Sequence, residues 1–162
     1  MQLPSIETTR LRLRHLEPKD AERLRDITDD PAITGAIQFL KSPFTLSDAL
    51  KLIENRASGV DCFFGVRLRE SDQLIGVVGA GFTDDGEVEI GYWIGTSFQR
   101  AGYAQEAGRA LLDLLARQFP SRSIIAVCKR NNLASRRVLE KLGFKATGEP
   151  SHRPDRERFV LF

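Results

Sequence analysis

The chain has 162 residues and a formal net charge of +2, with 41% hydrophobic and 28% charged residues. This length fits one domain, residues 1–162. The nearly balanced charge does not favour a nucleic-acid partner. No apolar run nears the roughly 20 residues that cross a bilayer, and the first residues lack a signal-peptide pattern. Cys62 and Cys128 are too far apart for a zinc motif. We therefore expect a cytoplasmic protein without a metal or membrane partner, and both monomer and homodimer stay open.

The first third of the chain predicts one strand and two helices. Residues 10–16 alternate apolar and basic side chains, which is typical of a half-buried strand. Pro18 suits the first turn of a helix, and Thr45 with Asp48 resembles a capping box that opens a second helix. The apolar face of the first helix is expected at Ala21, Leu24 and Ile27. That of the second is expected at Leu46, Ala49, Leu50 and Ile53.

The middle of the chain contains three apolar runs typical of strands. They cover residues 62–68, 74–82 and 88–94. Ser71 and Asp72 separate the first two, and Asp84, Asp85 and Gly86 separate the second pair. An Asp-Gly pair between apolar runs is a strong hairpin signal. The pattern predicts an antiparallel meander.

The last third returns to helical spacing. A helix is expected over residues 103–118, stopped by Pro120, and a short strand over residues 123–127. The next helix presents Ser135, Val138, Leu139 and Leu142 on one face, and Gly143 ends it. Residues 145–148 and 158–162 predict a last pair of strands. The order β-α-α-β-β-β-α-β-α-β-β predicts an α/β fold, a mixed sheet with helices on its faces.

The turn between residues 97 and 104 is a candidate anion site. It leads from a strand into a long helix, whose first amides lack intrahelical partners and face the positive end of the helix dipole. Gly102 and the small Ala104 permit close approach of a ligand, and Arg100 can add a bidentate contact to a phosphate. An ordinary strand-to-helix turn, in which Gly102 only relieves strain, is the alternative.

Together the motifs resemble the GNAT acetyltransferases, and in particular the branch of the ribosomal-protein N-terminal acetyltransferases. The resemblance covers nearly the whole chain. It rests on residues 7–14, 75–76, 89–94 and 99–104, and on residues 132–135 with 140–144. The fourth segment matches the family's acetyl-CoA motif, Gln/Arg-x-x-Gly-x-Gly/Ala.

The resemblance implies the GNAT fold, a central, splayed and mostly antiparallel sheet with helices on both faces. It also implies that acetyl-CoA is the cosubstrate and that no metal is needed. Its pantetheine arm would lie like an extra strand between residues 88–94 and 123–127, with its pyrophosphate on the amides of residues 100–104. The cofactor-binding residues implied are Ile94, Gln99, Arg100, Ala101, Gly102, Tyr103, Ala104, Asn132 and Ser135.

The implied reaction is acetyl transfer to a primary amine by direct attack, without a covalent acyl-enzyme. An alkylammonium must lose a proton before it can attack, and a carboxylate with a raised pKa can accept that proton directly or through a water. Glu89 is the best candidate, because regular alternation places it on one strand face with Gly91 and Trp93. A structural carboxylate is the alternative.

The leaving thiolate needs a proton donor. Ser135 is the candidate, because a serine at this position of the family lies near the cofactor sulfur. The alternative is a structural serine at the start of a helix that bonds a backbone carbonyl. Tyr103 is a second possible acid. Asn132 is expected to cap its helix and to contact the pantetheine. Tyr92 and Trp93 are assigned either to the acceptor pocket or to the core.

The sequence leaves the acceptor open. A peptide or protein N-terminal α-amine is the first expectation. A small amine such as a polyamine, an amino acid or an antibiotic is the second, and a non-catalytic acyl-CoA-binding module is the third. The acceptor pocket is expected to depend on residues 28–60.

Overall fold

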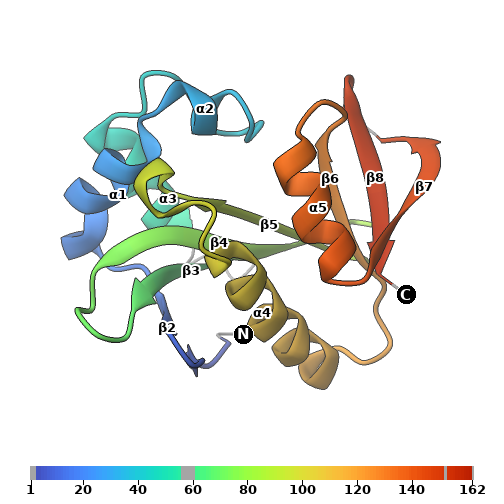
Figure 1. Cartoon of the computed structure of the whole chain (residues 1–162), viewed down its shortest axis with the longest axis horizontal. Coiled ribbons are helices and arrows are strands. Elements are labelled where there is room, and N and C mark those ends of the chain that lie inside the picture. The colour runs from blue at the N-terminus through green and yellow to red at the C-terminus, as the bar shows by residue number, and fades with distance from the viewer. Residues whose placement is uncertain (1–2, 56–60, 152, 162) are drawn as a thin grey trace.

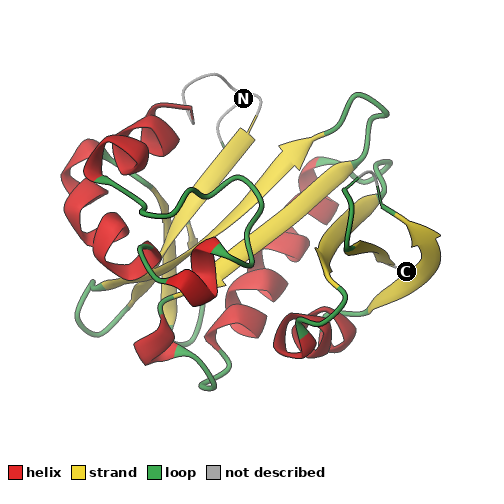
Figure 2. Cartoon of the chain, turned by 90° about the horizontal axis from the view of Figure 1, so that it is seen from above, coloured by secondary structure: helices red, strands yellow, loops and turns green. Residues whose placement is uncertain are grey.

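The fold is one eight-stranded sheet with helices packed on both faces (Figures 1 and 2). The computed structural model describes residues 3–55, 61–151 and 153–161. The strands are β1 (Ile6–Glu7), β2 (Leu11–His15), β3 (Asp61–Leu68), β4 (Leu74–Phe82), β5 (Val88–Ile94), β6 (Ile124–Lys129), β7 (Phe144–Pro150) and β8 (Arg156–Leu161). Their order is β1-β2-β3-β4-β5-β6-β8-β7. Every neighbouring pair is antiparallel except β5 and β6, which are parallel.

The helices are those that the sequence predicts, with one short addition. They are α1 (Ala21–Thr28), α2 (Pro31–Thr34), α3 (Leu46–Asn55), α4 (Tyr103–Gln118) and α5 (Leu133–Lys141). One-turn 3-10 helices precede α1 at Pro18–Asp20 and follow β5 at Thr96–Phe98. The predicted capping box of α3 is confirmed, since the Asp48 amide donates to the Thr45 hydroxyl and the Thr45 amide to the Asp48 carboxylate.

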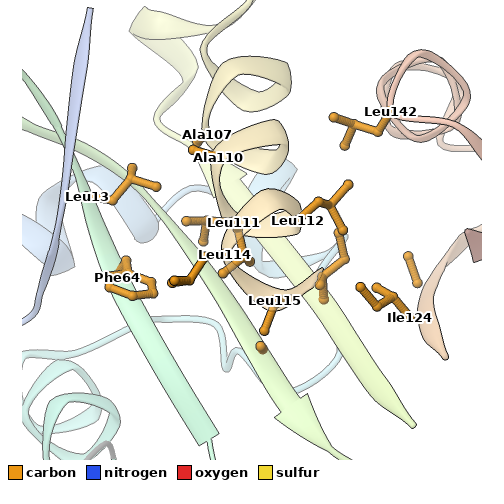
Figure 3. Packing of buried hydrophobic residues seen from close by; sticks show 14 of the residues in the cluster. Leu13, Phe64, Ala107, Ala110, Leu111, Leu112, Leu114, Leu115, Ile124 and Leu142 are labelled. Atoms are coloured by element: carbon orange, nitrogen blue, oxygen red, sulfur yellow. The ribbon is translucent and has the colours of Figure 1, made fainter. Parts of the chain in front are cut away.

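Two apolar cores lie on opposite faces of the sheet. On one face α4 packs along β2–β5. Figure 3 shows the leucines of α4 among the residues of this core. Leu112 lies on the side of α4 toward Leu142, the residue that follows α5. On the other face α1 and α3 pack on Leu74, Val77 and Trp93. The indole of Trp93 donates to the Thr28 hydroxyl at 3.0 Å, which ties β5 to the end of α1.

The structure corrects several details of the sequence-based prediction. Leu46, expected on the apolar face of α3, is 36% exposed, and Leu52 is buried instead. The reason is position, because Leu46 is the first residue of α3. Strand β6 covers Ile124–Lys129 and so begins and ends later than the predicted 123–127. The last two strands begin at Phe144 and Arg156, before the predicted starts at 145 and 158. Phe162, at the end of the predicted last strand, lies outside the described residues.

The sheet splits between β5 and β6. Their register pairs Val88 with Ile124, Glu89 with Ile125 and Ile90 with Ala126. From Gly91 to Ile94, β5 continues against β4, while β6 continues against β8. Figure 1 shows the two halves of the sheet diverging, with the start of α4 and all of α5 beside the divergence. The split leaves the second half of β5 with a free edge.

Candidate active site

The turn before α4 has the backbone of an anion site. Gly102 is the N-cap of α4 and has φ 82°, and Arg100, two residues earlier, has φ 66°. The first amide of α4 with an intrahelical acceptor is that of Glu106, which donates to the Gly102 carbonyl at 3.0 Å. The amides before it are therefore available to a ligand. Successive amides around left-handed residues form a concave nest that favours anions.

Side chains from outside the turn hold it in place. Arg10, between β1 and β2, donates from Nη1 to the Ala101 carbonyl at 2.8 Å and from Nε to the Glu106 carboxylate at 2.7 Å. Its guanidinium lies 4.4 Å from the centre of the Tyr103 ring. Gln99 donates to the Ile94 carbonyl at 2.9 Å and so closes the turn onto the end of β5.

Glu106 is the centre of this clamp. The Thr8 hydroxyl, the Arg10 amide and the Arg10 side chain all donate to its carboxylate. Burial by itself raises the pKa of Glu106, but these hydrogen bonds outweigh it and hold the pKa below its usual value. The carboxylate is therefore ionised at neutral pH and joins the N-terminal segment to the first turn of α4.

Ser135 lies beside Tyr92 at the split. The two hydroxyl oxygens are 3.0 Å apart, and the Tyr92 hydroxyl also lies 3.2 Å from the Ser135 carbonyl as a donor. Burial raises the pKa of Tyr92 to about 12, against the opposing hydrogen bond with Ser135. Burial likewise raises the pKa of the Cys128 thiol, which also has a hydrogen bond with Ser135. All three groups are thus protonated at neutral pH and form a small cluster of proton donors.

Asn132 is the N-cap of α5, as the sequence predicts. Its side-chain oxygen accepts a hydrogen bond from the Ser135 amide at 3.2 Å. This bond fixes the first turn of α5 and with it the position of the Ser135 hydroxyl. Contact of Asn132 with a pantetheine arm stays a prediction, as does a role for the Tyr103 hydroxyl as an acid. The Tyr103 ring itself packs under Arg10.

Glu89 forms an ion pair with Arg153. The Arg153 guanidinium donates to the Glu89 carboxylate at 2.7 Å, and the side chains are 26% and 18% exposed, respectively. Glu89 comes from β5, and Arg153 follows β7 in the connection to β8. The pair therefore spans the two halves of the split sheet. A partly exposed pair of this kind can exchange partners at modest cost.

Glu89 and Arg153 line a pocket of about 620 Å³. Most of its other lining residues are apolar and come from two parts of the chain. Residues Ile37, Phe39, Leu40, Phe44 and Leu52 come from α3 and the segment before it, and Phe63, Phe82, Ile90, Tyr92 and Trp93 come from β3–β5. The volume lies within the range usual for small-molecule sites. Within the stretch 28–60, residues between Ile37 and Asn55 line this pocket, and residues 56–60 lie outside the described residues. Tyr92 and Trp93 also line the pocket, and the role of the pocket in the choice of acceptor stays a prediction.

Glu89 and Ser135 approach the open edge of β5 from different sides. The alternation of β5 places Trp93 in the core under α1 and α3, on the face of Glu89, whereas Tyr92 packs against the core under α4. Tyr92 still lines the pocket because no strand covers β5 along this stretch. Two substrates that react at this edge would have the Glu89 carboxylate on one side and the Tyr92 and Ser135 hydroxyls on the other.

Sequence reasoning missed three residues of this arrangement. Tyr92 was assigned to the pocket or the core, yet its hydroxyl is the partner of Ser135. Arg153 and Arg10 had no assigned role. The Glu89–Arg153 pair joins residues 64 positions apart, so no local pattern signals it. For Arg10 a signal was present, because Thr8, Arg10 and Glu106 all fall within or beside the family segments.

Among residues 3–55, 61–151 and 153–161, no group of three or more His, Cys, Asp or Glu side chains is arranged to hold a metal ion. None of the helices in the same ranges has the length and apolar character needed to cross a membrane.

Comparison with known proteins agrees with this fold. A family model described as an acetyltransferase (GNAT) domain matches residues 10–145. The uncharacterized N-acetyltransferase YnaD of Bacillus subtilis is 32% identical over 144 residues, which are 88% of this chain and 84% of YnaD.

Solved structures extend the likeness of fold to the full chain. RimL, a ribosomal L7/L12 α-N-protein acetyltransferase in complex with coenzyme A, superposes with a TM-score of 0.81 at 18% identity and 98% coverage of both chains. The ribosomal-protein-S5-alanine acetyltransferase of Vibrio fischeri has a TM-score of 0.78 at 20% identity, covering 97% of this chain and 94% of its own.

A mixed, mostly antiparallel sheet of this order with helices on both faces is the GNAT fold. The family match and the identity to YnaD place the chain more narrowly: it belongs to the GNAT acetyltransferase family and is an N-acetyltransferase.

Proposed function

We propose that the protein transfers an acetyl group from acetyl-CoA to the N-terminal α-amine of a peptide or protein, by direct attack of the amine on the thioester. The observation that carries the proposal is the convergence at the free edge of β5. The anion-binding turn lies at one end of this edge, and Glu89 and the Tyr92–Ser135 pair lie on its two sides.

The residues of the turn fit the pyrophosphate of acetyl-CoA. Arg100 and Gly102 have positive φ, so that the amides up to Gln105 line a concave surface at the positive end of α4. A Cβ on Gly102 would lie 3.3 Å from Arg10 Nη2, which leaves little room for a side chain. The free edge of Gly91–Ile94 supplies backbone groups for the pantetheine arm. Acetyl-CoA itself supplies the activated acetyl group.

Removal of the amine's proton falls to Glu89. An incoming ammonium competes with Arg153 for the carboxylate, and Arg153 can move toward solvent because it is only partly buried. Glu89 then accepts the proton directly or through a water. The neutral nitrogen forms its bond to the acetyl carbon while the bond from that carbon to sulfur breaks.

The sulfur that leaves takes a proton from the Ser135 hydroxyl, which can recover one from Tyr92, and Tyr92 is then reprotonated from solvent. Tyr92 has a pKa raised to about 12 by burial, so that it holds its proton at the pH of the reaction. The 3.0 Å contact between the two oxygens is short enough for direct transfer. Tyr103 remains the alternative donor.

The choice of an α-amine rests on two considerations. RimL and the Vibrio fischeri enzyme, which share the fold, are ribosomal-protein acetyltransferases, and RimL acts on an α-amine by its name. An α-amine also has a pKa of about 7.7–8.0, against about 10.4 for a lysine side chain, so that it loses its proton more readily. A small amine is the second candidate, because the pocket volume of about 620 Å³ is large enough for one.

The test is a screen of amine acceptors with detection of free coenzyme A thiol. Peptides with a free N-terminus, the same peptides with a blocked N-terminus and one internal lysine, polyamines and free amino acids form the panel. Turnover with free N-termini and little with the blocked peptides supports the proposal. Turnover with polyamines or amino acids alone overturns the α-amine part and leaves an N-acetyltransferase of small amines.

A further inference from the structure

Gly91 is where the pocket reaches the backbone of β5. It lies between Glu89 and Trp93 on the same face of the strand, and it is exposed. A Cβ built on Gly91 meets no atom within 4 Å, and Gly91 is not among the residues with positive φ. Neither backbone strain nor packing explains a glycine here. The missing side chain leaves open space beside the candidate base.

A second pocket glycine provides the contrast. Gly79 pairs with Gly91 across the β4–β5 ladder and also lines the pocket. A Cβ on Gly79 would lie 2.7 Å from a Phe63 ring carbon and 2.8 Å from the Cys62 carbonyl. Gly79 is therefore required by packing. Gly91 is not, so its effect is on what enters the pocket.

Three aromatic rings line the same pocket as Gly91. The Phe39 ring centre lies 5.9 Å from that of Trp93 in an edge-on arrangement and 6.0 Å from that of Phe63. Phe39 is 57% exposed, which is unusual for so large an apolar side chain. Trp93 is held by its hydrogen bond to Thr28. A ring exposed at the rim of a pocket gains burial when an apolar group enters.

The carboxylate of Glu89 fixes the orientation of an acceptor in this space. An ammonium at Glu89 has the gap at Gly91 next to it and the three rings beyond the gap. A side chain on the carbon that carries the amine would occupy the gap and contact Phe39. A small side chain would leave that volume unfilled and Phe39 exposed.

We propose, on the basis of the proposed function, that the acceptor carries a large apolar or aromatic side chain next to its amine, and that Gly91 sets the size limit. For a peptide acceptor this means a first residue such as Phe, Leu or Met rather than Ser or Ala. Gly91 and Phe39 are then the specificity-determining residues of the pocket.

The first test compares peptides that differ only in their first residue. The wild-type protein is expected to acetylate peptides starting with Phe or Leu with a kcat/KM at least about tenfold above that for Ser or Ala, the scale on which apolar pockets discriminate. Gly91→Leu fills the gap. It is expected to remove the preference by lowering kcat/KM for the large residues more than for the small ones, and the ratio between the two classes of peptide cancels any effect of Gly91 on the pantetheine arm.

A second variant approaches the pocket from its rim. Phe39→Ala is expected to raise KM several-fold for the large first residues and to leave KM for Ser or Ala unchanged, because Phe39 is largely exposed and carries little folding energy. The matched control is Leu46→Ala, an exposed apolar residue of the same region that does not line the pocket, and its kinetic constants should equal those of wild type.

The outcomes separate the two proposals. If the wild-type protein acetylates no free α-amine, the proposed function fails. If it acetylates peptides with small and large first residues equally well, or prefers the small ones, this inference is overturned while the proposed function stands. Equal loss of activity toward all acceptors in both Gly91→Leu and Phe39→Ala also overturns it, because a size limit must act selectively.

Discussion

The turn proposed for the cosubstrate and the pocket proposed for the acceptor are built in opposite ways. The turn consists of consecutive residues between β5 and α4, and its shape depends on a local feature, left-handed backbone at Arg100 and Gly102. The pocket draws its lining from residues between Ile37 and Arg153, which meet only in the folded chain. One site is specified by a short segment, whereas the other depends on how distant segments pack.

The two sites also differ in how firmly they are held. The turn is clamped by Arg10 and Glu106, with several charged hydrogen bonds on one carboxylate. The pocket depends on a partly exposed ion pair and on Phe39, a mostly exposed ring. A rigid site for the common cosubstrate and an adaptable site for the acceptor are what a family with one donor and many acceptors requires. Substitutions of the apolar pocket residues should therefore change the affinity for the acceptor more than the affinity for acetyl-CoA.

The largest effect is expected for Glu89→Gln, which keeps the shape of the side chain and removes its basicity. We expect kcat to fall by about 10²–10⁴-fold, the range for loss of a general base. The pH–rate limb that reports the base should vanish, so that the residual rate rises with the fraction of neutral amine. Steady-state rates across pH with a peptide acceptor measure both.

Glu87→Gln is the matched control for Glu89→Gln. Glu87 lies two positions earlier, is also paired with an arginine, Arg158, and does not line the pocket. The side-chain hydrogen bond from Arg158 holds the pKa of Glu87 below its usual value, so this carboxylate is ionised at neutral pH. Its kcat should stay within about twofold of wild type. Equal rates and pH profiles in wild type and Glu89→Gln would make Glu89 a structural residue.

The second effect in size is that of Ser135→Ala, which removes the donor nearest to Tyr92. We expect kcat to fall by about 10–1000-fold with the affinity for acetyl-CoA little changed, because the hydroxyl acts on the leaving sulfur. If Ser135 and Tyr92 act as a unit, Tyr92→Phe and the double variant should lose about as much as Ser135→Ala alone. Undiminished turnover in Ser135→Ala would transfer the role to Tyr103 or to solvent.

The contrast between the two sites explains what the sequence could predict. The bounds of α4 agree with the prediction at both ends, because Gly102 and Pro120 are local signals. The turn and Asn132 were predicted for the same reason. Tyr92 and Ser135 are 43 positions apart, so their contact has no local signal, and the strand pattern alone leaves Tyr92 ambiguous between core and pocket. The predicted burial of Leu46 is wrong because hydrophobic periodicity does not show whether other residues cover the first turn of a helix.

The third prediction concerns the free energy of unfolding at high pH, which depends on Tyr92 at the split of the sheet. Tyr92 has a pKa of about 12 in the folded protein and about 10 when unfolded, so the folded state keeps a proton that the unfolded state loses. The stability that depends on this proton is complete below pH 10 and is lost as pH rises toward 12. The loss should reach up to about 3 kcal/mol. Urea unfolding from pH 9 to 12 should show wild type losing more stability than Tyr92→Phe, and parallel curves would contradict the assigned burial.

The smallest effect is expected for Gly102→Val, which tests whether the turn binds the cosubstrate. Valine disfavours the φ of 82°, and its side chain would crowd Arg10, so the affinity for acetyl-CoA should fall by several-fold or more in a folded protein. Gly86→Val is the matched control, because Gly86 has φ 84° in the hairpin turn before β5, with open space around it. Both variants should lose stability through backbone strain, but only Gly102→Val should lose affinity in calorimetry. Equal affinity in the two variants would mean that this turn is only a connection between β5 and α4, and that acetyl-CoA is held elsewhere along the split.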